Sequence, residues 1–246
     1  MSGLSWRAQL AVSLLLTAVA IYTINFLVFR DAGFMLKLLL AQLGFLPISV
    51  FFVTLVINQL LVRRERLARL KKLNMVVGAF FSEVGNDLLR RLAAFDAHGP
   101  ELARVMCPDC AWTPQTLAAS QSAAASHRPA VDLNRGDLEG LRPFLGERRQ
   151  FLLRLLENPS VLEHESFSEL LWAVFHLAEE VIHRLDLENL SENDRSHLAR
   201  DVERSYVLLI SEWLAYLEYL ERTYPYLFSL AVRLNPFDPE AGAAIQ

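Results

Sequence analysis

The chain has 246 residues, a formal net charge of −4 at pH 7 and a hydrophobic fraction of 53%. This length accommodates one membrane unit and one modest soluble domain, which excludes a large multidomain enzyme. The weak negative charge gives no basis for binding nucleic acid, and two cysteines cannot form the disulfide framework of a secreted fold. We therefore expect a helical protein in a reducing compartment.

The first 62 residues are almost wholly apolar. Residues 8–29 contain no formal charge, and residues 34–62 contain only Lys37, near their start. Each segment is long enough to cross a hydrocarbon core of about 30 Å. The sequence thus predicts a transmembrane hairpin over residues 1–62, with its connection at residues 30–33.

A cleaved signal peptide over residues 1–20 is an alternative interpretation of the same region. Arg7 precedes an apolar run, and Ala18-Val19-Ala20 has the small-residue pattern of a cleavage site. The apolar run nevertheless continues to Phe29, which a signal peptide does not need. A transmembrane span is therefore favoured.

The distribution of basic residues predicts the orientation of the hairpin. Arg30 and Lys37 flank the short connection, whereas six basic residues follow the second span: Arg63, Arg64, Arg66, Arg69, Lys71 and Lys72. Because Lys and Arg accumulate on the cytoplasmic side, both termini are predicted to be cytoplasmic. This makes the chain an integral protein of a bacterial-type inner (plasma) membrane, with the lipid bilayer as its first partner.

Uncharged polar residues occur within the second predicted span. Gln42 and Ser49 are seven residues apart, and Thr54 and Asn58 are four apart. In an oligomer such residues could line a pore, but they also serve as ordinary hydrogen bonds between helices. Helix contact is the favoured interpretation, because no carboxylate within the spans marks an ion path.

Residues 63–97 have the composition of a juxtamembrane helix with a coiled-coil-like pattern. The heptad pattern begins within the second span, with which this helix is continuous. Apolar residues occupy nine of its twelve places: Val53, Val56, Leu60, Leu67, Leu70, Val77, Phe81, Val84 and Leu88. Asn74 lies at a seam position, where a polar residue can specify register, and Gly78 and Gly85 flank Phe81 with room for close helix contact. This face either packs on later helices of the same chain, which is favoured, or forms a homo-oligomer.

Residues 98–136 are expected to form an irregular or low-complexity linker, because His98-Gly99-Pro100 ends the preceding helix and an Ala/Ser-rich run occupies residues 118–126. Thr113-Pro114 resembles a helix cap followed by a first-turn proline, so a weak helix is the alternative to a mobile linker here. The pair Cys107-x-x-Cys110 has the spacing of half a zinc site, to which His98 and His127 could add ligands. A redox role and plain reduced loop cysteines are the alternatives, and the last is favoured.

The pattern of caps and apolar residues over residues 137–246 predicts a cytoplasmic α-helical bundle. Ser166-Phe167-Ser168-Glu169 resembles a capping box and predicts the start of one helix. A second helix is expected from Ser191 to Tyr224, where Pro225 stops it, followed by a short helix over residues 226–234. The second helix has one apolar stripe, formed by Leu198, Val202, Tyr206, Leu209, Trp213, Leu217 and Leu220.

The helix after residue 166 also has a stripe of potential metal ligands. Its members are Glu165, Glu169, His176, Glu180 and His183. Glu180-x-x-His183 has the spacing found in di-iron carboxylate bundles, and His197 and Asp201 on the next helix could complete a site. A solvated helix face is the favoured interpretation, because the opposite face is apolar and His197 and Asp201 lie away from the apolar stripe of their helix.

No phosphate-binding loop, G-x-S-x-G, H-E-x-x-H or kinase motif occurs, so no enzyme class and no cofactor are indicated. The expected fold is an all-α membrane protein, a two-helix transmembrane hairpin continuing into a cytoplasmic helical bundle. The expected function is that of a non-enzymatic, oligomeric anchor presenting its bundle for protein contact or signalling. The alternatives are a small oligomeric ion channel with the second span lining the pore, and a membrane-tethered metal-binding sensor or enzyme.

Overall fold

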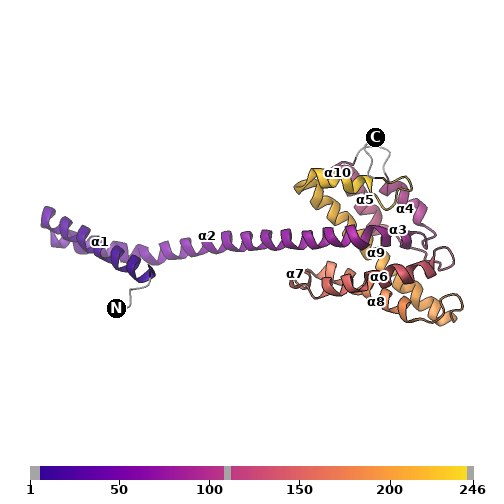
Figure 1. The fold of residues 1–246 in the computed structure, drawn as a ribbon. Coiled ribbons are helices and arrows are strands. Elements are labelled where there is room, and N and C mark those ends of the chain that lie inside the picture. Colours follow the sequence, from indigo (N-terminus) through magenta and orange to yellow (C-terminus); the bar gives the residue numbers. More distant parts are fainter. Residues whose placement is uncertain (1–5, 108–111, 243–246) are drawn as a thin grey trace. The chain divides into compact units, whose positions relative to one another are not determined.

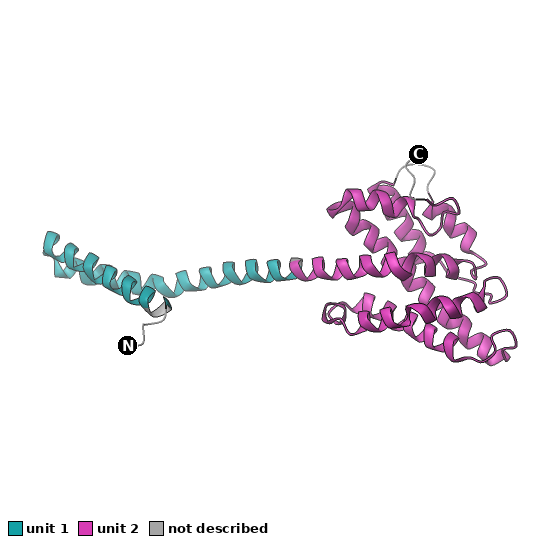
Figure 2. Cartoon of the chain, in the orientation of Figure 1, with its two compact units in different colours: residues 1–66 teal, residues 67–246 magenta. Residues whose placement is uncertain are grey.

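The computed structural model describes residues 6–107 and 112–242, without the side chains of Arg7, Ala8 and Leu67. Helices make up 81% of the structure, and the described residues contain no strand, only an isolated bridge between Asp96 and Val131. The predicted all-helical fold is therefore confirmed. The chain divides into two compact units, Met1–Arg66 and Leu67–Gln246 (Figure 2).

The first unit contains two helices that are long and apolar enough to cross a membrane. Helix α1 spans Trp6–Phe29, and helix α2 begins at Ala32 and continues to Phe80. Arg30 adopts a left-handed backbone with φ of 49°, and its N–H donates to the Phe26 carbonyl at 2.9 Å, which caps α1. Asp31 then caps α2 by accepting from the Phe34 N–H at 2.9 Å. The turn is therefore two residues long, shorter than the predicted four.

Three polar side chains in this unit donate hydrogen bonds within a helix or between the two helices. The Tyr22 hydroxyl on α1 donates to Gln42 Oε1 on α2 at 2.5 Å. The hydroxyls of Thr17 and Thr23 donate to carbonyls one turn earlier in their own helix, at 2.9 and 2.8 Å. Gln42 is thus a helix–helix contact in the single chain, the use favoured over a pore position.

The second unit is a helical bundle whose elements are labelled in Figure 1. After Phe80 the helix continues through a π-helical turn, η1 (Phe81–Gly85), into α3 (Asn86–Ala93). The remaining helices are α4 (Gly99–Met106), α5 (Pro114–Ser126), α6 (Leu138–Leu156), α7 (Pro159–Leu162), α8 (Glu165–His183), α9 (Glu192–Thr223) and α10 (Pro225–Arg233).

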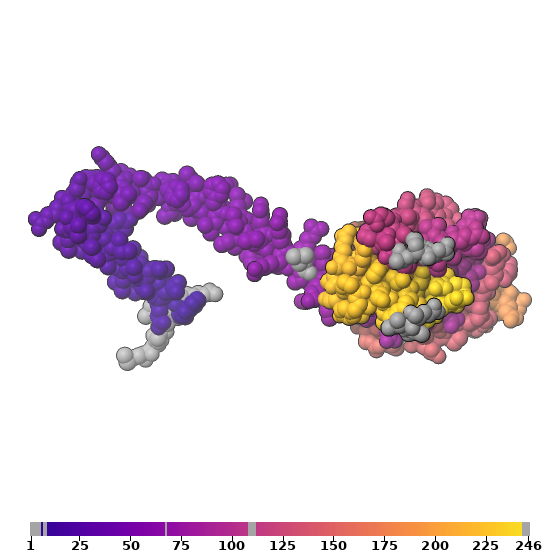
Figure 3. All heavy atoms as spheres, turned by 90° about the horizontal axis from the view of Figure 1, so that it is seen from above, coloured from indigo at the N-terminus to yellow at the C-terminus, as the bar shows by residue number. Residues whose placement is uncertain are grey.

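Helix α9 organises the core of this unit. It packs against η1, α3, α5, α8 and α10, and α8 packs in turn against α6 and α7. The apolar stripe of α9 is buried as predicted, and Trp213 and Tyr206 are the largest fully buried side chains. In contrast, α10 has no buried residue, and Figure 3 shows this part of the chain, in yellow, at the surface of the unit.

The range 98–136 contains α4 and α5 instead of an irregular linker, and α5 agrees with the alternative of a helix that starts at Thr113-Pro114. Thr113 caps α5 by a box in which the partner at the third helical position is Thr116, and Pro114 occupies the first turn. The Ala-rich run has high intrinsic helix propensity, and Leu117 and Ser120 are buried. Low sequence complexity here reflects a small-residue helix packed against α9.

The two helices that form the candidate site begin at different kinds of cap. Helix α9 starts as predicted, with Ser191 accepting from the Asp194 N–H at 3.2 Å. Helix α8 begins earlier than its predicted capping box, with His164 as the cap residue. The hydroxyl of Ser168 instead donates to the Val161 carbonyl at 2.6 Å, which ties α8 to the short helix α7.

Candidate metal centre

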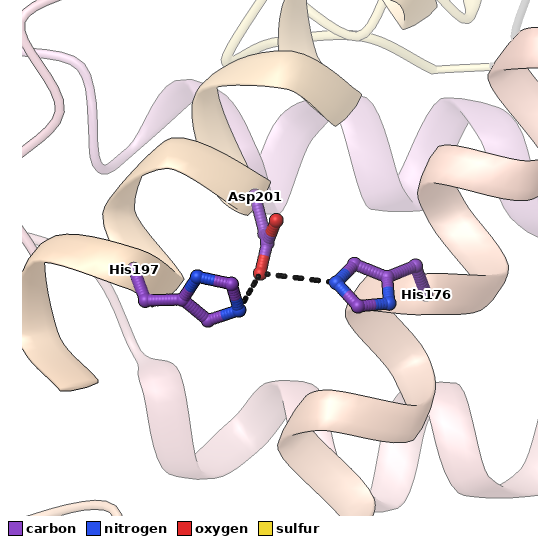
Figure 4. A group of neighbouring side chains, drawn as sticks. All are labelled: His176, His197 and Asp201. Carbon is purple, nitrogen blue, oxygen red and sulfur yellow. Dashed lines mark ion pairs between the residues drawn. The ribbon is translucent and has the colours of Figure 1, made fainter.

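Three potential metal ligands converge between α8 and α9 (Figure 4). His176 comes from α8, and His197 and Asp201, one turn apart, come from α9. The Nε2 atoms of His176 and His197 lie 3.5 and 3.3 Å from Asp201 Oδ2, and all three ligand atoms lie within 4.8 Å of one another. The packing of two helices thus brings together residues separated by more than 20 positions.

The separations between these atoms match those of a metal coordination sphere. Zinc binds imidazole nitrogen at about 2.0–2.1 Å and carboxylate oxygen at about 2.0–2.2 Å, and a tetrahedral angle places the two donor atoms about 3.4 Å apart. The observed nitrogen–oxygen distances of 3.3 and 3.5 Å lie on either side of this value. An ion could therefore enter with little movement of the side chains.

The carboxylate of Asp201 faces two imidazoles, but its Oδ2 atom accepts no hydrogen bond from a described residue. The residue is only 8% exposed, and this oxygen is buried. A buried carboxylate oxygen is costly unless a cation or hydrogen-bond donor faces it. The two imidazoles that face it are 48% and 45% exposed, so the centre is buried on the Asp201 side and open to solvent on the other.

Glu180 forms one wall of the centre and is held there by Arg184. Its Oε1 atom lies 3.9 Å from the Nε2 atoms of both His176 and His197. Its Oε2 atom accepts a short hydrogen bond from Arg184, whose other terminal nitrogen lies 3.5 Å from Asp194 at the start of α9. Burial raises the pKa of Glu180, but the hydrogen bond and charge of Arg184, with smaller effects of the two histidines, outweigh it, so the net pKa is lowered.

His183, the third residue of the predicted α8 stripe site, does not join the centre. Its Nδ1 atom bonds the Glu179 carbonyl at 2.9 Å, and its side chain is 69% exposed. The contacts of His183 with the carbonyl and carboxylate of Glu179 direct its ring away from the three-ligand cluster. His197 and Asp201, which the sequence offered as residues that could complete a site, do lie in this cluster, although they are away from the apolar stripe of their helix.

Cys107 is the member of the predicted cysteine pair that the structure describes. Burial, together with the nearby charge of Asp238, raises the pKa of the Cys107 thiol to about 11, which disfavours the thiolate that binds metals. His98 bonds the Arg128 carbonyl at 3.1 Å, and His127 pairs with buried Asp96 at 2.6 Å. Cys110 lies outside the described residues.

Of the four residues predicted to mediate close helix packing, Gly78 and Phe81 lie beside Tyr216 of α9 in the same chain. Phe81 stacks on Tyr216 with ring centroids 5.6 Å apart, and a Cβ atom on Gly78 would lie 2.8 Å from the Tyr216 hydroxyl. Gly85 lies directly against Phe81, and Asn74 donates to the Leu70 carbonyl of its own helix at 2.9 Å. These contacts agree with packing inside one chain, while oligomerisation through this face stays a prediction.

The other polar residues of the second predicted span make no comparable contact. Ser49 is half-buried, and Thr54 and Asn58 are exposed. Only Gln42 of the four predicted pore or interhelical residues has a hydrogen bond between helices in the described part of the chain. The pore interpretation of Ser49, Thr54 and Asn58 stays a prediction.

Comparison with known proteins identifies relatives along nearly the whole chain. Residues 69–233 match the family described as "Uncharacterized protein MJ1433, C-terminal helical domain", and residues 2–61 match "MJ1433, N-terminal helical domain". The "Uncharacterized protein MJ1433" of Methanocaldococcus jannaschii is 42% identical over 229 residues, which cover 93% of this chain and 92% of that protein. No solved structure matches the chain. The chain therefore belongs to the MJ1433 family, with both of its helical domains.

Proposed function

We propose that this protein is a membrane-anchored sensor that binds one divalent transition-metal ion between α8 and α9. The observation that carries the proposal is the set of three ligand atoms, within 4.8 Å of one another, which includes a buried carboxylate oxygen that accepts no hydrogen bond from a described residue. Exposed acidic clusters are common on helix surfaces, but Asp201 is buried and two imidazoles face it from different helices. That combination is what distinguishes this cluster from a solvated stripe.

The ligand types select the class of metal. Two imidazole nitrogens and one carboxylate oxygen suit zinc and neighbouring transition metals. Calcium and magnesium prefer sites built from oxygen alone. We therefore assign the centre to an ion of the zinc class.

In this proposal the apolar hairpin anchors the protein in the membrane. Its two helices are long enough to span a bilayer, and the basic residues after position 62 favour a cytoplasmic location for both termini and for the helical unit. In the cytoplasm the metal face would be available to a protein partner or to a second copy of the chain. Trp172, which is 58% exposed and one turn before His176, adds an aromatic contact residue beside the centre.

Metal titration of the full-length protein in detergent tests the proposal. Zinc binding is followed by calorimetry, and metal content after dialysis is measured by mass spectrometry. The wild type is expected to hold one ion per chain, and Asp201→Asn and His197→Ala are each expected to lower its affinity at least about 100-fold, because each removes a direct ligand.

His183→Ala is the matched control. It removes the same side chain as His176→Ala from the same helix, but His183 contacts Glu179 and lies outside the centre. We expect His183→Ala to retain wild-type affinity and His176→Ala to lose it. Wild-type protein without stoichiometric metal, or equal losses in the two histidine variants, would contradict the proposal.

A further inference from the structure

The metal centre has three close ligands and one carboxylate that lies farther away. The three-atom group consists of His176, His197 and Asp201, and the carboxylate that approaches both imidazoles but stays outside the group is that of Glu180. Zinc sites with four protein ligands are closed, whereas sites with three keep a position for water or another small ligand. The role of Glu180 therefore decides which kind of site this is.

Arg184 holds the Glu180 carboxylate in place, with its Oε1 atom 3.9 Å from the Nε2 atoms of both imidazoles. It holds Glu180 Oε2 through a short hydrogen bond and donates to the Glu180 backbone carbonyl at 3.1 Å from the same nitrogen. The guanidinium is only 17% exposed and also reaches Asp194 at 3.5 Å, so its position is fixed from two helices. To coordinate the metal, Glu180 would have to move toward the imidazoles while still bound to this group.

Solvent access and charge favour an anion at the remaining position. Both imidazoles are nearly half exposed, so the position facing away from Asp201 is open to water. A divalent ion bound by two neutral imidazoles and one carboxylate keeps a formal charge of about +1. The charge of Glu180 is offset by Arg184, which leaves this positive charge to attract a small anion.

We propose that the centre keeps one coordination position for an exchangeable ligand, water or a small anion such as a carboxylate, and that Arg184 preserves this position by holding Glu180 beside it. Glu180 then faces the exchangeable ligand as a hydrogen-bond acceptor for bound water. Arg184 is a positioning residue that acts through Glu180. This inference rests on the proposed metal site and specifies the ligand chemistry of that site.

Cobalt substitution tests the inference, because the visible absorption of Co²⁺ reports its coordination. The full-length protein is loaded with Co²⁺, and sodium azide or sodium acetate is then titrated in. We expect a saturable spectral change in the wild type. An unchanged wild-type spectrum, together with a response in Glu180→Ala, would show that Glu180 is the fourth ligand and would overturn the inference.

Two arginine variants separate positioning from general stability. In Arg184→Gln, Glu180 is released toward the metal, so we expect anion affinity to fall at least about tenfold while Co²⁺ remains bound. Arg149→Gln is the control, because Arg149 makes a similar ion pair with Glu179 on α8, with Nε and Oε1 2.6 Å apart, outside the centre. Equal anion affinity in both variants would contradict the role of Arg184. Absence of Co²⁺ binding in the wild type would instead refute the metal site itself.

Discussion

At the scale of single residues, the centre depends on the contrast between a buried carboxylate and exposed imidazoles. His176 and Glu180 could be predicted as candidates from the sequence, because an i,i+4 pair of potential ligands stands out on an amphipathic helix. His183 could not be excluded, since the sequence does not show that it would bond its own helix. Asp201 was placed away from the apolar stripe, yet it is buried because α8 covers it.

The ion pair between Arg184 and Glu180 predicts that the stability of the folded protein depends on pH. The folded-state pKa of Glu180 is lowered, so this pair contributes stability above the ordinary glutamate pKa of about 4.3 and loses it as the pH falls through the lower folded value. Arg184→Met should therefore destabilise the metal-free protein by about 1 kcal/mol at pH 7 and by less near pH 3. Thermal melting of both proteins at the two pH values measures the difference.

The expected pH dependence comes from the loss of the ion pair and not from the change in size of the side chain at position 184. Arg149→Met, which breaks the Arg149–Glu179 pair, should show the same direction of pH dependence, because the pKa of Glu179 is lowered mainly by its hydrogen bond to Arg149. If Arg184→Met were equally destabilising at pH 7 and pH 3, the loss would come from packing alone.

At the scale of elements, helices with strong periodic signals were predictable and those defined by tertiary packing were not. The apolar stripe of α9 and its cap at Ser191 follow from residue spacing and cap chemistry. Helix α5 could be predicted only as an alternative to a linker, because its start at Thr113-Pro114 has cap chemistry but its Ala/Ser-rich run has no periodic contrast and packs against α9. The π-helical turn at Phe81–Gly85 likewise has no sequence signature beyond its single glycine, Gly85.

Gly85 provides a test of that turn. A Cβ atom at this position would lie 2.5 Å from Phe81 and 2.9 Å from Phe80, and both rings are buried. Gly85→Ala should therefore destabilise the protein by about 1–3 kcal/mol, despite the better helix propensity of alanine. Gly146→Ala in α6 is the matched control, because no atom lies within 4 Å of its Cβ position.

The control should move in the opposite direction. With space available, alanine at position 146 is expected to stabilise the protein by up to about 1 kcal/mol. Unfolding followed by circular dichroism measures both variants. Stabilisation by Gly85→Ala would mean that the turn relaxes readily and that the close contact with the two rings is not a constraint.

At the scale of the whole molecule, the chain combines an apolar helical pair with a helical bundle. Hydropathy alone indicated both parts, and the division into units at Arg66 and Leu67 falls close to the expected end of the hairpin at residue 62. The family match shows the same two-part organisation, with regions at 2–61 and 69–233. The ligand set of the centre could not be predicted at this scale, because it depends on how α8 and α9 pack.

The orientation of the whole chain is testable with fusions. Green fluorescent protein attached to either terminus should be fluorescent in cells, because both termini are proposed to be cytoplasmic, where this reporter folds. Both fusions should also remain attached to the full-length chain in membrane fractions. Loss of the N-terminal reporter by cleavage, with an external C-terminus, would favour the signal-peptide alternative.

X-ray absorption spectroscopy of the zinc-loaded, full-length protein tests the central claim most directly, because it identifies the atoms bound to the metal. The account predicts nitrogen and oxygen ligands at about 2.0–2.2 Å, including two imidazoles, and no sulfur. A sulfur ligand at about 2.3 Å would place zinc at the cysteine pair, and would contradict a centre formed by His176, His197 and Asp201.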